Sequence, residues 1–118
     1  MIKLWDECSD LEQKQLMQLF DDMTPYYNRI AVYDVDKAFV SEHKVPCVRV
    51  ALAARKVTLA AELKPEEAIF SDDLFAQLVT QAWQTAFSPE DRSFFNANLQ
   101  NAAECFRMGI MMADLPGL

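Results

Sequence analysis

The single histidine, His43, and the three cysteines are the side chains with which this chain could bind a metal or act as a nucleophile. His43 and Cys47 are one helical turn apart, which would place them on one helix face, but Pro46 between them is expected to break that helix. Cys47 also lies in a Val-Pro-Cys-Val segment, which is typical of a buried and unreactive thiol. Glu104 and Cys105 have no histidine near them in the sequence. We therefore expect no metal site, no cofactor and no catalytic residue, and we do not expect an enzyme.

Carboxylates are the other groups that could perform chemistry, and 18 Asp and Glu against 11 Lys and Arg give the chain a net charge of -7. A carboxylate pair acts as acid and base only where its surroundings shift one of the two pKa values. No apolar stripe in the sequence is interrupted by an acid in a way that forces burial. The charge balance also argues against direct nucleic-acid binding, because phosphate neutralisation requires a basic surface. We expect the acids to meet a protein partner that has a basic surface.

The sequence gives no sign of export or of membrane insertion. Its first residues, Met1 to Glu7, turn acidic before an apolar segment can form, unlike a secretory signal. The longest uncharged run, Leu74 to Pro89, is too short and too rich in Gln and Thr to cross a bilayer. Three widely spaced cysteines fit reduced thiols better than a disulfide framework. We expect a cytoplasmic protein that does not bind membranes.

Two adjacent acids, Asp21 and Asp22, are expected at the C-terminal end of the first helix, where the helix dipole disfavours negative charge. They could pair with Arg29 across the following turn as an ordinary surface ion pair. Alternatively, they join neighbouring acids in a patch that meets a basic partner, and the tyrosines beside Arg29 add a contact site. On the second interpretation the partner-binding residues are Asp21, Asp22, Tyr26, Tyr27, Asp34, Asp36 and Glu42.

Charge is nearly absent from residues 74–113, where the ionised side chains are Glu90, Asp91, Arg92, Glu104 and Arg107. The helix expected over residues 72–87 therefore has a neutral polar face, although helix faces in water usually carry Lys and Glu. Such a face is expected to be covered, either by the first three helices of the same chain or by a second copy. We favour a homodimer with an isologous interface. Its contact residues are expected to be Gln77, Thr80, Gln81, Gln84, Met108, Met111 and Met112.

The elements that must position these side chains are expected to be helices, because glycine occurs only at Gly109 and Gly117. Loops that hold phosphates and tight hairpin turns need positive φ angles, which glycine adopts most easily. The sequence thus predicts an all-α, single-domain bundle of about five helices over residues 1–118. β-Branched residues leave an alternative, an α+β fold with a small sheet within residues 29–63. Caps, prolines and apolar periodicity predict helices over about 10–23, 24–42, 46–63, 72–87 and 89–110, with a short helical turn from Pro65.

The function that these features favour is non-catalytic binding to another protein. A small acidic helical domain suits an inhibitor, immunity or adaptor role, in which it masks a basic surface of its partner. The alternative is a small-ligand-binding domain with an apolar pocket between Trp83 and the last helix.

Overall fold

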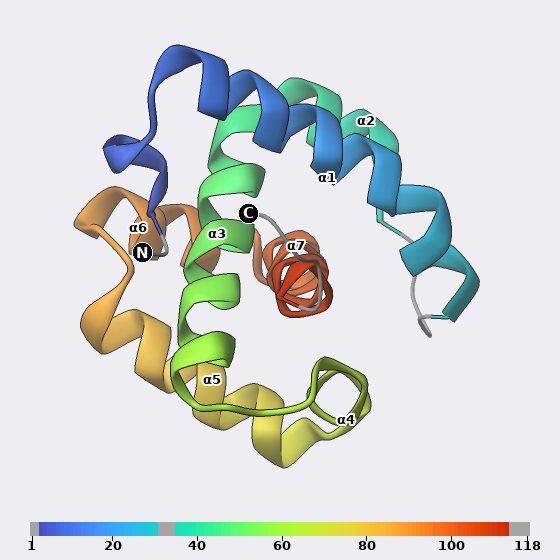
Figure 1. Ribbon diagram of the computed structural model, residues 1–118, viewed down its shortest axis with the longest axis vertical. Coiled ribbons are helices and arrows are strands. Elements are labelled where there is room, and N and C mark those ends of the chain that lie inside the picture. The colour runs from blue at the N-terminus through green and yellow to red at the C-terminus, as the bar shows by residue number, and fades with distance from the viewer. Residues whose placement is uncertain (1–2, 31–34, 114–118) are drawn as a thin grey trace.

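The computed structural model describes residues 3–30 and 35–113, and the regular elements in these ranges are all helical (Figure 1). A short 3-10 helix, η1 (Trp5–Glu7), precedes the α-helices. The prediction of an all-α fold is confirmed, and the described part of residues 29–63 contains no strand. The α-helices are α1 (Asp10–Ile30), α2 (Lys37–Glu42), α3 (Lys44–Ala60), α4 (Pro65–Phe70), α5 (Asp72–Thr85), α6 (Pro89–Ala97) and α7 (Leu99–Met112), more than the five or so expected.

Three of the helices begin at the caps that the sequence predicts. Before α1, the Glu12 backbone N–H donates to Ser9 Oγ at 3.2 Å, and the Ser9 N–H donates to Glu12 Oε1 at 3.0 Å. Ser71 Oγ accepts a backbone N–H from the first turn of α5. Ser88 and Asp91 form a second reciprocal pair of hydrogen bonds before α6. These bonds satisfy N–H groups that the first turn of a helix leaves without partners.

Helix α1 continues past Thr24 and Pro25, where a second helix is expected to begin, and ends at Ile30. Thr24 does not cap a new helix, because its hydroxyl donates to the Phe20 carbonyl oxygen at 2.9 Å within the same helix. Pro25 removes one N–H from the helix. Tyr27 beyond it is fully buried, however, and anchors the last turns of α1 to the core. Tertiary packing therefore outweighs the local signal for a helix start.

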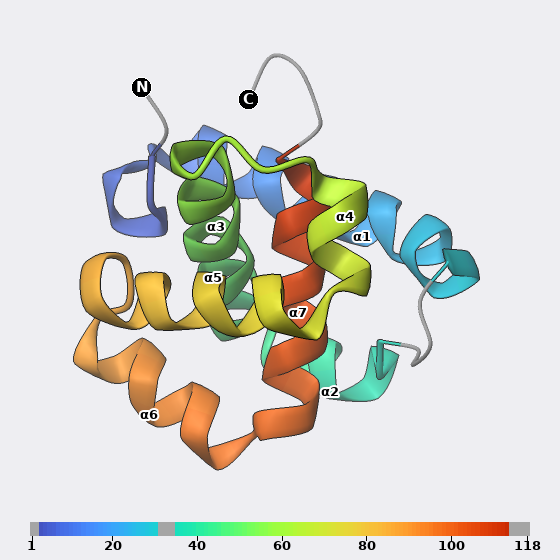
Figure 2. The same cartoon turned by 90° about the horizontal axis from the view of Figure 1, so that it is seen from below.

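The last predicted helix is divided at Asn98, which separates α6 from α7. Asn98 has φ -137° and ψ 48°, outside the helical region, and its side-chain amide donates to the Phe94 carbonyl oxygen at 3.0 Å. Asparagine side chains can replace helical hydrogen bonds in this way. Figure 2 shows the consequence, since α7 turns away from α6 and runs back through the molecule.

Helices α3 and α7 form the centre of the molecule and cross at a steep angle, as Figure 1 shows by presenting α3 along its length and α7 nearly end-on. Gly109 of α7 lies at this crossing. A Cβ atom built on Gly109 would be 1.9 Å from the carbonyl oxygen of Ala51 in α3, so the two backbones can meet this closely only at a glycine. The remaining helices surround the crossed pair, and the predicted bundle is not confirmed.

The core is built mainly from α3 and α7. Every residue of α3 from Cys47 to Ala54 is buried except Arg49, which is half-buried. Phe106 of α7 is fully buried and meets three aromatic rings edge-on, those of Phe75, Phe87 and Phe95. Although this centre is apolar, none of the helices in the described ranges combines the length and the hydropathy that a membrane crossing requires.

Candidate interaction surfaces

The neutral face of α5 is open to solvent. Gln77, Thr80, Gln81 and Gln84 are all exposed, whereas Leu78 and Ala82 on the opposite face are buried. One of the two sequence interpretations requires the first three helices of the same chain to cover this face. They do not cover it in the structure. Thr80 uses its hydroxyl within the helix, donating to the Ala76 carbonyl oxygen at 2.9 Å. The glutamine amides remain as the outward polar groups of the face.

A groove of mixed polarity borders this face where the end of α3 meets α5. Its volume is about 330 Å³. Its lining combines aliphatic side chains from α3, α5 and the turn after α3 with two glutamines of α5. The lining residues are Val57, Ala60, Ala61, Leu63, Gln77, Leu78 and Gln81. We name this feature the α3–α5 groove. It gives the neutral face a concave part that the sequence does not reveal.

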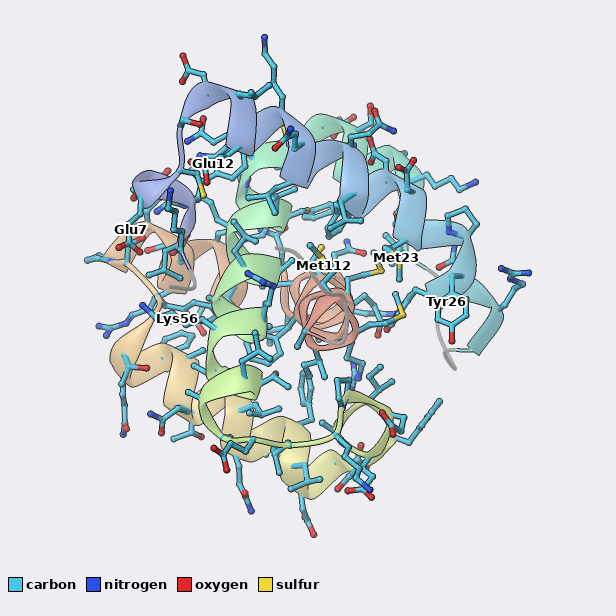
Figure 3. All side chains as sticks on the ribbon, in the orientation of Figure 1. Glu7, Glu12, Met23, Tyr26, Lys56 and Met112 are labelled. Atoms are coloured by element: carbon cyan, nitrogen blue, oxygen red, sulfur yellow. The ribbon has the colours of Figure 1, made fainter. Side chains whose placement is uncertain are left out.

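The three methionines expected to extend the self-association surface lie in the core. Met108 and Met112 are fully buried and Met111 is nearly so. Figure 3 shows Met112 at the centre of the molecule, with Met23 directed toward it from α1. Because α7 is central, its apolar stripe packs inside the chain, so these three residues are removed from the expected contact surface.

The acids expected to form a partner-binding patch are only partly available for one. Asp21 and Asp22 lie within α1 and not at its end, because the helix continues to Ile30. Asp21 forms an ion pair with Lys44 instead of Arg29, and Asp22 accepts a hydrogen bond from Gln18 at 2.9 Å. The other expected acids differ in their roles: Asp36 caps α2, Glu42 is exposed, and Asp34 lies outside the described residues.

The two adjacent tyrosines have opposite environments. Tyr26 is exposed, and the Arg29 guanidinium lies over its ring at 5.9 Å from the centroid. Figure 3 shows Tyr26 at the edge of the molecule. Tyr27 is fully buried and its hydroxyl donates to Glu104 Oε2. Tyr27 therefore has no surface to offer a partner, and only Tyr26 remains as a candidate contact.

Glu104 is a buried acid that the sequence interpretation misses. It is 4% exposed and lies between Tyr27 and Arg107, whose Nη1 donates to Glu104 Oε1 at 3.1 Å. Burial raises the pKa of Glu104, although the hydrogen bonds from Tyr27 and Arg107 oppose this shift. Burial and the Glu104 hydrogen bond also raise the pKa of Tyr27. Because Tyr27 belongs to α1 and both Glu104 and Arg107 belong to α7, the cluster joins these two helices.

A second polar cluster surrounds Arg49 at a cavity of about 300 Å³ between η1, α3 and the α5–α6 turn. The guanidinium donates from Nε to Asp91 Oδ1 at 2.8 Å and from Nη1 to Asp6 Oδ1 at 2.8 Å. Nη2 also reaches Ser88 Oγ at 3.3 Å. Burial disfavours the charged form of Arg49, but the bonds to Asp91 and Asp6 outweigh it and raise the pKa of Arg49. The cluster ties the N-terminal segment to α3 and α6.

The side chains considered for metal or nucleophile chemistry are held apart from solvent or from one another. Cys47 and Cys105 are buried, and a hydrogen bond from Cys47 together with burial raises the pKa of Cys105. His43 stacks on Phe39 with ring centroids 4.4 Å apart. Pro46 is expected from the sequence to break a helix between His43 and Cys47. It lies instead in the first turn of α3, where its missing N–H is tolerated. Within the described residues, no group of three or more His, Cys, Asp or Glu side chains could hold a metal ion.

Aromatic rings connect Trp83 with α7, where an apolar ligand pocket is the alternative prediction. Phe87 and Phe95 meet Trp83 edge-on and also contact Phe106 of α7. Arg92 donates two hydrogen bonds to the Trp83 carbonyl oxygen, at 2.6 and 3.0 Å, and its guanidinium carbon lies 6.0 Å from the centroid of the Trp83 ring. The α3–α5 groove and the Arg49 cavity are lined by other residues.

Comparison of the chain with protein-family models, with curated proteins and with solved structures found no match. The surfaces described above are therefore interpreted from their own chemistry.

Proposed function

We propose that this protein is a non-catalytic binding domain of the inhibitor, immunity or adaptor kind, which forms a homodimer through α5 and masks a basic surface of a partner protein. The observation that carries the proposal is the distribution of charge over the exposed side chains. Among the described residues, thirteen exposed acids stand against four exposed Lys and Arg, and the exposed face of α5 between residues 74 and 85 carries no charge. A strongly acidic surface and a neutral one suit two different kinds of partner.

The surface is more acidic because several Arg and Lys side chains are engaged in contacts within the chain. Arg92 and Arg107 are turned onto α5, and Arg49 is held by two carboxylates. Lys44 is partly buried in its ion pair with Asp21. Acids such as Asp22 and Glu42 remain exposed. A basic partner would therefore meet negative side chains with few competing cations, which raises the rate of association.

The neutral face of α5 supports self-association for the complementary reason. Two copies that each carry a net charge of -7 repel each other over most approaches. The α5 face avoids this repulsion, and its glutamine amides carry both donors and acceptors, so the same surface can pair with itself. The α3–α5 groove adds some aliphatic surface, from Val57, Leu63 and Leu78, beside these amides.

Replacing Gln81 with glutamate is expected to weaken self-association by about tenfold or more, because the symmetric dimer would then hold two added carboxylates at one interface. Size-exclusion chromatography with light scattering at micromolar concentration measures the effect. The wild-type protein is expected at twice the 13.5 kDa chain mass, and Gln81→Glu at or near the single-chain mass. Gln15→Glu is the matched control, since Gln15 is an exposed glutamine of α1. A wild-type protein that elutes at 13.5 kDa would refute the dimer.

Replacing Asp22 and Glu42 with lysine is expected to weaken binding of a short lysine- and arginine-rich peptide by about tenfold, because each reversal removes an attraction and adds a repulsion. Fluorescence anisotropy of the labelled peptide at increasing salt measures the affinity, which should fall steadily as salt screens the charges. Asp10→Lys with Glu90→Lys provides the same change of net charge elsewhere. Equal losses in both double variants, or affinity independent of salt, would exclude this surface as the basic-partner site.

A further inference from the structure

We draw no further inference here: the strongest candidate, the cavity of about 300 Å³ around Arg49 between η1, α3 and the α5–α6 turn, holds a guanidinium that Asp6 and Asp91 of the same chain already bind, and nothing among the described residues points to a ligand that would replace them.

Discussion

Replacing Gly109 with alanine is expected to lower the free energy of unfolding by about 2 kcal/mol or more. Alanine has the higher helix propensity by about 1 kcal/mol, so local preference alone would predict stabilisation. The added methyl carbon would, however, lie 1.9 Å from the Ala51 carbonyl oxygen and 2.6 Å from its carbonyl carbon. Both are backbone atoms of a buried helix and cannot rotate away as a side chain would. The α3–α7 crossing must therefore open, and the packing around Phe106 is lost with it.

Urea unfolding followed by circular dichroism at 222 nm measures this effect. Ala103→Gly is the informative control, since Ala103 is a half-buried position on the same helix. There the change from alanine to glycine should cost about 1 kcal/mol through propensity alone. If Gly109→Ala were as stable as the wild type, or more stable, the close approach of α3 and α7 would be refuted.

The parts of the fold that the sequence predicts correctly are those fixed by nearby residues. Ser9 and Glu12 form hydrogen bonds between residues three apart in the sequence, and so do Ser88 and Asp91. These helix caps can therefore be recognised from the sequence. Pro25 gives a misleading signal because proline at a helix start and proline within a helix differ only in what surrounds them. The burial of Tyr27, which decides between the two, depends on α7 and is not encoded locally.

The predictions for the candidate sites are right or wrong for the same reason, namely whether one helix alone carries the signal. The absence of charge along Gln77, Gln81 and Gln84 follows from residue types on one helix face, and the structure needs only to add that this face is exposed. The methionines mislead because a helix at the centre and a helix at an interface both carry an apolar stripe. Glu104 escapes prediction because its partners, Tyr27 and Arg107, come from different turns of two helices. Nothing in a single helix tells an acid that points outward from one that is satisfied inside.

Arg49 allows the effect of burial on an ion pair to be measured with one guanidinium and two carboxylates. The Asp91 side chain is 8% exposed and accepts from Nε, whereas the Asp6 side chain is 72% exposed and accepts from Nη1 and Nη2. Asp91→Ala is expected to lower the free energy of unfolding by about 3 kcal/mol, because it leaves a partly buried cation without its inner partner and removes a cap of α6. Asp6→Ala is expected to cost at most about 1 kcal/mol, since solvent already screens that pair.

Urea unfolding of Arg49→Met, of Asp91→Ala and of the double variant that combines them distinguishes the effect of a buried unpaired charge from the loss of contacts. The loss in the double variant should be smaller than the sum of the losses in Arg49→Met and Asp91→Ala alone, because each single change strands a charge that the double change removes. Ser88→Ala measures the share of the Ser88 hydroxyl, since it removes the acceptor of the Asp91 N–H and of Arg49 Nη2 but leaves the Arg49–Asp91 ion pair in place. Equal losses in Asp6→Ala and Asp91→Ala would mean that the bidentate geometry at Asp6, and not burial at Asp91, sets the strength of the cluster. We expect Asp91→Ala to cost more free energy of unfolding than Asp6→Ala, because water can replace the exposed Asp6 carboxylate as a partner of Arg49.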